Sequence, residues 1–280
     1  MDLVLYPSPK ADTFAAVFQH IRLFCDHINL SFEPGRLYMQ CMDNAHVAIL
    51  ELDLPAEWFD RYELAAGAIT FGINAGFLYR ILAAREKTQQ MHLVYSEADN
   101  DVLRVHLTSE SNKNTSFDKH FEIPLISIES ETMEIPAIEY AAEMSISSSH
   151  FAGIINQLKM FGDTMEIQCS EDKIMLASNS QDQGKMYVEI NIDDVSAFAI
   201  EEGSQLNLSF SLTYLHHICM YNKLAKEVEL KFSESYPMQI VYVLAKDVSS
   251  AGKDATTEQN EESESKDARL LFYLAPKIAD

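Results

Sequence analysis

The chain has 280 residues, 47% of them hydrophobic, so it can bury a sizeable core without disulfides and is long enough for two domains of ordinary size. Its 43 acidic residues outnumber its 21 lysines and arginines, which argues against a nucleic-acid partner unless the basic residues gather on one surface. The first residues form no basic leader, and no stretch approaches the roughly 18 apolar residues of a membrane span, so we expect a soluble protein that is not exported.

Four short segments carry apolar residues at steps of three and four, the spacing of one helical face. They lie at residues 14–25, 77–82, 151–161 and 214–221. Runs with the alternation of strands fill the gaps between them, at residues 36–42, 46–52, 68–73, 91–95, 102–107, 164–169, 173–178, 185–190, 206–210, 227–232, 239–244 and 270–274. Because many of these strands follow one another without a helix between them, we predict an α+β fold with antiparallel sheets.

The order of elements, one helix followed by several strands, occurs four times, and the first pair of units resembles the second pair. We therefore predict a duplicated protein with two similar domains, each containing two such units. The domains are expected at residues 1–120 and 141–280, with an extended connector at 121–140 that contains Pro124 and Pro136. Residues 247–267 contain almost no large apolar side chain, which predicts a disordered loop.

Signatures of catalysis and metal binding are missing. The four cysteines, Cys25, Cys41, Cys169 and Cys219, are far apart and form no CxxC pair, so we expect reduced thiols and no zinc site. There is no glycine-rich phosphate loop, no HExxH and no nucleophile elbow. We therefore expect neither an enzyme nor a cofactor, although a compact set of perturbed ionisable groups in a pocket would reopen an enzymatic interpretation.

Carboxylates are depleted around the four expected helices. Residues 12–27, 74–87, 147–161 and 212–226 hold three acidic residues, where an even distribution over the chain would give about nine. The same windows hold seven lysines and arginines and five of the nine histidines. If the helices share one surface, that surface is neutral to weakly positive and can approach phosphates. The alternative is that short helices with apolar faces are acid-poor by chance.

Several motifs spread along the chain resemble those of the proliferating cell nuclear antigen family. They are Met-Asp-Asn-Ala-His-Val at 42–47, Phe59-Asp60 with Tyr62, Ile135-Pro136 with Glu139-Tyr140, Phe-Gly-Asp at 161–163, and Leu-Ala-Pro-Lys-Ile at 274–278. They occur in the family's order over nearly the whole length of the chain.

The resemblance implies the α+β fold of a sliding clamp and DNA polymerase processivity factor, with two similar domains each made of duplicated β-α-β-β-β units. Three copies would close head-to-tail into a ring, with antiparallel sheets outside and helices lining the hole. Double-stranded DNA, bound without sequence preference, a clamp loader and a nuclear location, or a viral replication compartment for a virus-encoded chain, are expected with it. The DNA-facing positions are then Arg22, Arg80, Arg85, Lys159, His216, Lys223 and Lys226. The subunit interface is expected between residues 108–121 of one copy and 185–190 of the next, with Phe121, Met186 and Val188.

The family also binds peptides of polymerases and other proteins through a hydrophobic pocket, into which they insert a helical turn. The matching positions are Met42, His46, Val47, Ile49, Met133, Ile135, Pro237, Tyr273, Pro276 and Ile278. Val47 and Ile49 could equally be core residues, whereas Pro276 and Ile278 are better explained by binding.

Some positions depart from the family pattern. Ala15 and Ala16 stand where relatives often carry lysines, and Gly153 and Asn156 replace expected arginines, so DNA contact should be weak with a shallow salt dependence. Glu171 occupies the place of a lysine that eukaryotic relatives modify with ubiquitin. These departures indicate a distant member. A clamp subunit of a checkpoint-type hetero-oligomer and an acidic scaffold that never encircles DNA remain alternatives.

Overall fold

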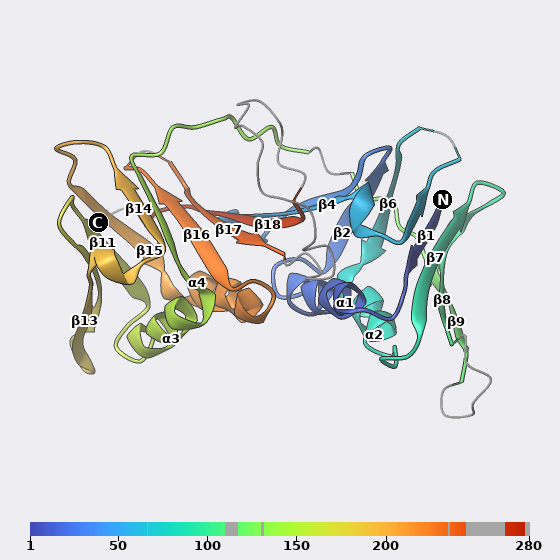
Figure 1. Cartoon of the computed structure of the whole chain (residues 1–280), viewed down its shortest axis with the longest axis horizontal. Helices are drawn as coiled ribbons and strands as arrows, with labels where there is room; N and C mark the ends of the chain where they lie inside the picture. Colours follow the sequence, from blue (N-terminus) through green and yellow to red (C-terminus); the bar gives the residue numbers. More distant parts are fainter. Residues whose placement is uncertain (66, 110–116, 130–131, 235, 245–266, 278–280) are drawn as a thin grey trace, which may run out of the picture. The chain divides into compact units, whose positions relative to one another are not determined.

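The computed structural model describes the whole chain except residues 66, 110–116, 130–131, 235, 245–266 and 278–280 (Figure 1). Within this part, four α-helices alternate with groups of strands: α1 (Pro9–Ile21), α2 (Ala75–Leu82), α3 (Ser148–Leu158) and α4 (Leu212–Cys219). Pairing between the strands is antiparallel wherever a register is defined, which confirms the predicted α+β class.

Each helix belongs to a β-α-β-β-β unit, the unit that the family resemblance implies. The order of elements read from the sequence predicts a helix followed by strands in each unit, but not the opening strands β1 and β10. The first two units comprise β1 (Asp2–Leu5), β2 (His27–Glu33), β3 (Arg36–Met42) and β4 (Ala48–Pro55) around α1, and β6 (Ile69–Asn74), β7 (Gln90–Ser96), β8 (Asp99–Thr108) and β9 (Lys119–Pro124) around α2. The last two comprise β10 (Ala142–Ser147), β11 (Thr164–Cys169), β12 (Ile174–Ser180) and β13 (Gly184–Ile190) around α3, and β15 (Leu206–Ser211), β16 (Glu227–Phe232), β17 (Met238–Val243) and β18 (Arg269–Leu274) around α4. Two short strands, β5 (Arg61–Glu63) and β14 (Ala197–Ile200), lie outside these units.

The chain divides into two compact parts. The first consists of Met1–Gln40, Leu52–Ser130 and Leu244–Arg269, and the second of Cys41–Glu51, Glu131–Val243 and Leu270–Asp280. Both parts thus contain segments from distant regions of the sequence. The connector expected at 121–140 begins within β9, which runs to Pro124, and the loop expected at 247–267 falls outside the described residues except for Asp267.

In both parts the two repeats exchange their first strands. In the first part β1 pairs with β7 of the other repeat and β6 pairs with β2, and one sheet has the order β5-β1-β7-β8-β9. In the second part β10 pairs with β16 and β15 pairs with β11, and one sheet has the order β13-β12-β11-β15. Because each repeat supplies a strand to the other, neither repeat can complete its sheets alone.

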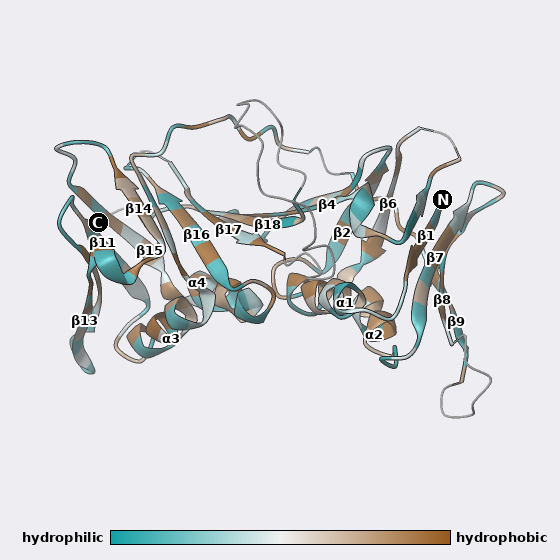
Figure 2. Cartoon of the chain, in the orientation of Figure 1, coloured by the Kyte–Doolittle hydropathy of each residue, from teal (hydrophilic) through white to brown (hydrophobic). Residues whose placement is uncertain are grey.

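The helices pack their apolar faces inward. On α1, the residues Phe14, Val17, Phe18 and Ile21 are at most 1% exposed, which confirms the face predicted from their spacing. Figure 2 shows brown, hydrophobic segments on the helices beside teal, hydrophilic ones. The N-termini of α1 and α2 are capped by side chains, since Ser8 Oγ accepts from Ala11 N and Asn74 Oδ1 accepts from Phe77 N at 2.8 Å. The fourth predicted helix ends early, because a 3-10 turn (Met220–Lys223) follows α4.

Sequence patterns missed several strands whose exposed sides carry polar residues. β2 alternates buried Ile28, Leu30 and Phe32 with histidine, asparagine, serine and glutamate, and β10 alternates Ala142, Met144 and Ile146 with glutamate and serine. β2 has the period of a half-buried strand, but its first residue, His27, is the last residue of the 12–27 window around the first expected helix.

Gly72 lies in close contact with the segment that follows β9. Its backbone pairs with Ile126 in both directions, with N···O distances of 3.2 and 3.0 Å. A Cβ atom added to Gly72 would lie 2.4 Å from Ile126 O and 2.6 Å from the side chain of Ile128. The absence of a side chain is therefore what lets this segment approach β6.

The G72A substitution should lower the free energy of unfolding by about 1–3 kcal/mol, because backbone must move to accommodate the methyl group. G35A is the matched control, since a Cβ at Gly35 meets no atom within 4 Å, and should change stability by no more than about 0.5 kcal/mol. Urea unfolding of both variants measures the difference. Equal stabilities would show that the segment after β9 does not rest on Gly72.

Candidate partner-binding cavity and helical surfaces

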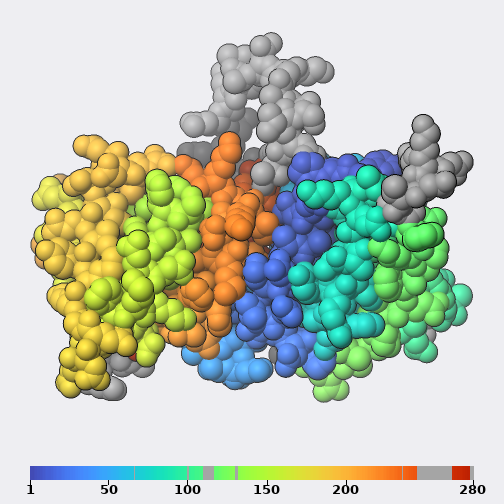
Figure 3. All heavy atoms as spheres, turned by 90° about the horizontal axis from the view of Figure 1, so that it is seen from below, coloured from blue at the N-terminus to red at the C-terminus, as the bar shows by residue number. Residues whose placement is uncertain are grey.

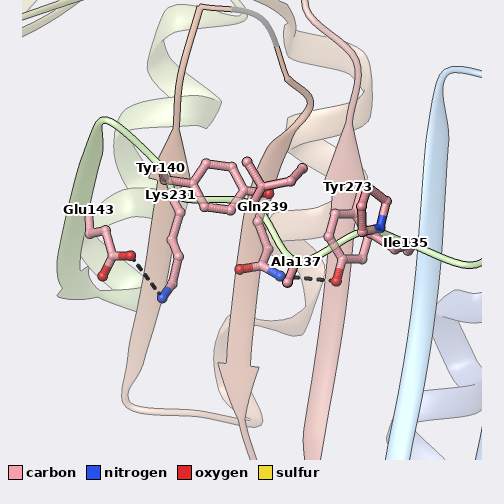
Figure 4. A pocket seen from close by; sticks show the side chains of 9 residues that line it. Ile135, Ala137, Tyr140, Glu143, Lys231, Gln239 and Tyr273 are labelled. Atoms are coloured by element: carbon pink, nitrogen blue, oxygen red, sulfur yellow. Dashed lines mark hydrogen bonds and ion pairs between the residues drawn. The ribbon is translucent and has the colours of Figure 1, made fainter.

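A cavity of about 300 Å³ lies in the second part of the chain, between residues 135–140 and one face of a sheet (Figure 4). The strands β10, β16, β17 and β18 supply one side chain each to it. Its lining residues are Ile135, Pro136, Ala137, Ile138, Tyr140, Glu143, Lys231, Gln239 and Tyr273. Apolar residues of the 135–140 segment therefore face polar and aromatic residues of the sheet, an arrangement typical of ligand sites.

The polar side of the cavity is organised by an ion pair. Glu143 and Lys231 are opposite each other in the β10–β16 register, and Lys231 Nζ lies 3.1 Å from Glu143 Oε1 and 3.2 Å from Glu229 Oε1. Burial alone would lower the pKa of Lys231, but the hydrogen bond to Glu143 and the charge of Glu229 outweigh it and raise that pKa. Lys231 is therefore cationic and held in place.

Two tyrosines give the cavity hydrogen-bonding capacity. Gln239 Nε2 donates to Tyr273 Oη at 3.0 Å, and burial together with nearby Glu51 raises the pKa of Tyr273 to about 12. Burial and Glu143 also raise the pKa of Tyr140, whose buried hydroxyl has no hydrogen-bond partner among the described residues. Tyr140 Oη is thus a protonated donor that a bound group could use.

Asp43 fixes the loop that precedes β4. Its carboxylate accepts hydrogen bonds from Ala45 N, Val47 N and Ala48 N at 2.9, 2.7 and 2.6 Å, and Tyr214 Oη donates to it at 2.5 Å. Although burial would raise the pKa of Asp43, the bonds from Tyr214 and the backbone lower it. A charged Asp43 therefore holds the loop in one conformation, with His46 exposed at a φ of 57°.

Residues 275–277, which follow β18, are bound to the same loop and to β15. Ala275 N donates to Val47 O at 3.0 Å, and Lys277 N donates to Ser209 O at 2.7 Å. Val47 and the residues next to Pro276 are therefore neighbours although more than 200 positions separate them in the sequence.

All the expected pocket positions that the structure describes belong to the second part of the chain, but only Ile135 and Tyr273 line the cavity. Ile49 lies two residues before Glu51 on β4, on the side of that strand near Tyr273. Met42, Val47, Ile49, Met133, Pro237 and Pro276 are partly exposed, so none is a fully buried core residue. Ile278 lies outside the described residues.

Sequence reasoning did not assign Tyr140, Glu143, Lys231 or Gln239 to the pocket. Glu143 and Lys231 are 88 residues apart and meet only because β10 pairs with β16. Since β10 was not among the expected strands, its register with β16 could not be inferred.

In the first part, α1 and α2 lie side by side and present two basic side chains to solvent. Arg22 Cζ, just after α1, lies 5.1 Å from the ring centroid of Tyr79 on α2, and Arg80 Cζ lies 5.3 Å from that of Phe77. Arg85 differs, because its side chain is only 4% exposed, forms an ion pair with Asp12 and donates to Gln89 O at 2.9 Å. The guanidinium of Arg85 therefore makes its contacts within the protein, so we do not include Arg85 among the residues proposed to face DNA.

In the second part, α3 and α4 are adjacent, and Figure 3 shows them side by side on the surface, in lime and orange. His216 Nδ1 lies 2.7 Å from Asn156 Oδ1, which links the two helices. Burial, and then the charge of Lys159, lower the pKa of His216, so its ring is neutral at pH 7. Lys223 and Lys226 are exposed, and Lys159 is half-buried. The sequences of the four helices contain one carboxylate, Asp12.

Two strands form sheet edges at the expected interface positions. β9 is the last strand of β5-β1-β7-β8-β9, and β13 is the first of β13-β12-β11-β15. Phe121 on β9 and Met186 and Val188 on β13 are half-buried, while Tyr187 is 61% exposed. Each edge offers unpaired backbone groups beside partly exposed apolar side chains.

None of the four cysteines forms a disulfide. Burial raises the pKa of Cys169 to about 11 and, despite a hydrogen bond to Tyr242, that of Cys219 to about 12. Within the described ranges no three histidine, cysteine or acidic side chains are arranged to share a metal ion. Of the helices in the described residues, none has the length and apolar character needed to cross a bilayer.

Comparison with known families accounts for this architecture. Residues 9–132 match the model of the proliferating cell nuclear antigen N-terminal domain, and residues 134–251 match that of the C-terminal domain. The chain therefore belongs to the proliferating cell nuclear antigen family, which confirms the resemblance seen in its motifs. It is similar to proliferating cell nuclear antigen 2 of Plasmodium falciparum, with 25% identity over 95% of this chain and 96% of the relative. It is also similar to proliferating cell nuclear antigen of Chaetomium thermophilum, with 26% identity over 97% of this chain and 96% of the relative. A third relative is the DNA polymerase sliding clamp of Pyrococcus abyssi, with 22% identity over 96% of each chain.

Proposed function

We propose that this chain is the protomer of a DNA sliding clamp that encircles duplex DNA and serves as a processivity factor for a DNA polymerase. Membership of the family supports this role, and one relative is itself named a DNA polymerase sliding clamp. The observation that carries the proposal is charge distribution: in a chain with a formal charge of −22, the four helices hold a single carboxylate. DNA would be accepted only along such a surface, because phosphates are repelled elsewhere.

The contacts proposed on this surface come from Arg22, Arg80, Lys159, Lys223 and Lys226, with His216 as a neutral polar neighbour. Contacts to phosphates position a protein without reading sequence, which suits sliding. Their small number, with Ala15, Ala16 and Gly153 at other helical positions, supports weak DNA contact. Retention on DNA would then depend on topology rather than affinity.

Closure into a homotrimer is proposed through the edge strands. Pairing β9 of one copy with β13 of the next would satisfy both unpaired edges and bury Phe121, Met186 and Val188. Such a contact joins different surfaces of identical chains. It closes into a ring of three when each copy is rotated by one third of a full turn relative to the copy before it.

Recruitment of polymerases and other partners is proposed at the cavity under residues 135–140 together with the 43–47 loop and the tail at 275–277. A bound helical turn would place apolar side chains against Ile135 and Tyr273, and Tyr140 Oη could donate to its backbone. The same proposal includes DNA polymerases and other proteins as partners, a clamp loader that opens the ring, and a nuclear location. The role itself is mechanical and requires no catalysis. Glu171 accepts a hydrogen bond from Gly203 N and offers no amine for ubiquitin.

Topological linkage tests the proposal. The chain is incubated with nicked circular DNA, a eukaryotic clamp loader and ATP, and complexes are separated from free protein by gel filtration in high salt. We expect the protein to elute with the circle and to be released when a restriction enzyme linearises the DNA. An acidic scaffold would never elute with the circle, and a protein bound by direct contacts would stay after linearisation.

A further inference from the structure

A row of three histidines crosses three neighbouring strands of the sheet in the first part of the chain. In the strand registers His92 on β7 is opposite His106 on β8, and His106 is opposite His120 on β9. Directly opposed residues on adjacent strands have Cβ atoms about 4.5–5.5 Å apart, so their side chains meet. The ring centroids are 5.8 Å apart for His92 and His106 and 4.8 Å apart for His106 and His120.

This row lies on the face of the sheet that points away from the helix α2. Lys119, the residue before His120, reaches the other way, where its Nζ bonds to Ala84 O at 2.8 Å just beyond α2. Leu107 and Val105, on either side of His106, are fully buried. The side chains of alternate residues on a strand point to opposite faces, so His106 and His120 face solvent. His106 is half-buried there and His120 is exposed.

The closest pair points two nitrogen atoms at one another. His106 Nδ1 and His120 Nδ1 are 2.7 Å apart. In the absence of a ligand one of them donates a proton to the lone pair of the other. A metal ion bound at about 2.0–2.1 Å from each nitrogen would need the two atoms roughly 2.9–3.4 Å apart, for angles between 90° and tetrahedral. A small rotation of either ring supplies this separation.

The charged side chains beside the pair have partners of their own. Arg104, in the next register row, forms ion pairs with Asp99 and with Glu122, the latter at 3.1 Å, so its charge is compensated. His92 Nε2 donates to Asp2 Oδ1 at 3.0 Å and is thereby held in place at the end of the row.

We propose that His106 and His120 bind a divalent ion of the zinc class (Zn²⁺, Ni²⁺ or Cu²⁺) through their Nδ1 atoms, on the exposed face of the β7–β8–β9 sheet. Imidazole is a preferred ligand of these ions. The protein supplies two ligands and water completes the coordination shell, in keeping with the absence of any three-ligand group among the described residues. The site lies within one chain and does not depend on ring formation.

Isothermal titration of the untagged full chain with zinc chloride, in a buffer that does not chelate zinc, tests the proposal. The wild type should bind one ion per chain, and H106Q and H120Q should each weaken binding at least tenfold. H150Q is the matched control, because His150 is an exposed histidine far from this sheet in the sequence, and it should bind as the wild type does. Circular dichroism verifies that each variant is folded, which glutamine on a solvent-facing strand position should permit.

A second measurement identifies the atoms involved. In nitrogen-15 NMR spectra of the histidine rings, zinc should shift the Nδ1 signals of His106 and His120 and leave those of His150 unchanged. The proposal is overturned if the wild type binds no zinc, if both H106Q and H120Q retain full affinity, or if H150Q loses binding to the same degree.

Discussion

Replacing Met186 by glutamate should convert a particle of about three times 31.7 kDa into single chains of 31.7 kDa. Met186 lies on the edge strand β13, half-buried in the isolated chain, and pairing with a second copy would bury it further. A carboxylate placed in such a contact would have to lose its hydration, where the thioether of Met186 loses none, and burying a charge that is not well paired costs several kcal/mol. Light scattering coupled to gel filtration measures the mass of the wild type and of M186E.

The matched control is M160E. Met160 is 62% exposed in the turn after α3 and lies on no sheet edge, so the same change of side chain should leave the mass of the particle unchanged. A wild type that is already a single chain would exclude the homotrimer and favour a subunit of a hetero-oligomer. If M186E remained a trimer, the interface would have to be sought away from β13.

The I135D substitution should weaken the binding of a partner peptide at least 30-fold, or about 2 kcal/mol, the size of a strong hot spot. Ile135 lines the cavity opposite Tyr273 and is the apolar wall against which a helical turn would pack (Figure 4). A carboxylate there would have to lose its hydration when the peptide covers it, and Glu143 already lines the same cavity. Fluorescence anisotropy of a labelled peptide with apolar and aromatic residues on one helical turn measures the affinity.

I126D is the control for this experiment. Ile126 precedes the same irregular segment and is 37% exposed, but it belongs to the first part of the chain and does not line the cavity. Its replacement should change the affinity less than twofold, and neither substitution should alter the particle mass. Unchanged affinity of I135D would remove the cavity from the proposed partner site, while leaving the proposed ring untouched.

M186E and I135D separate two properties that the sliding-clamp proposal combines. M186E addresses assembly at an edge strand, and I135D addresses recruitment at a cavity within a single chain. If the protein assembles into a ring and stays on circular DNA but does not bind the peptide, the result supports the sliding clamp and contradicts the proposed peptide pocket. The reverse result would describe a peptide-binding scaffold.

Local patterns in the sequence determined the features that depend on residues close together in the chain. The three- and four-residue spacing of Phe14, Val17, Phe18 and Ile21 predicts a helix with one buried face, and the structure confirms it because that spacing alone sets which side chains share a face. The sequence likewise shows the fourfold order of helix and strands, the depletion of carboxylates from the helices, and the family motifs.

Only the tertiary structure decided which distant residues meet. The exchange of β1 and β6 between repeats, the ion pair of Glu143 with Lys231 and the contact of His106 with His120 all depend on the partner and register of each strand. A shift of one residue in register would turn each of these side chains to the opposite face, and local propensity does not fix it. The same applies to Arg85, which counts as a basic residue in the sequence but is buried against Asp12, 73 positions away, once α1 and α2 pack together.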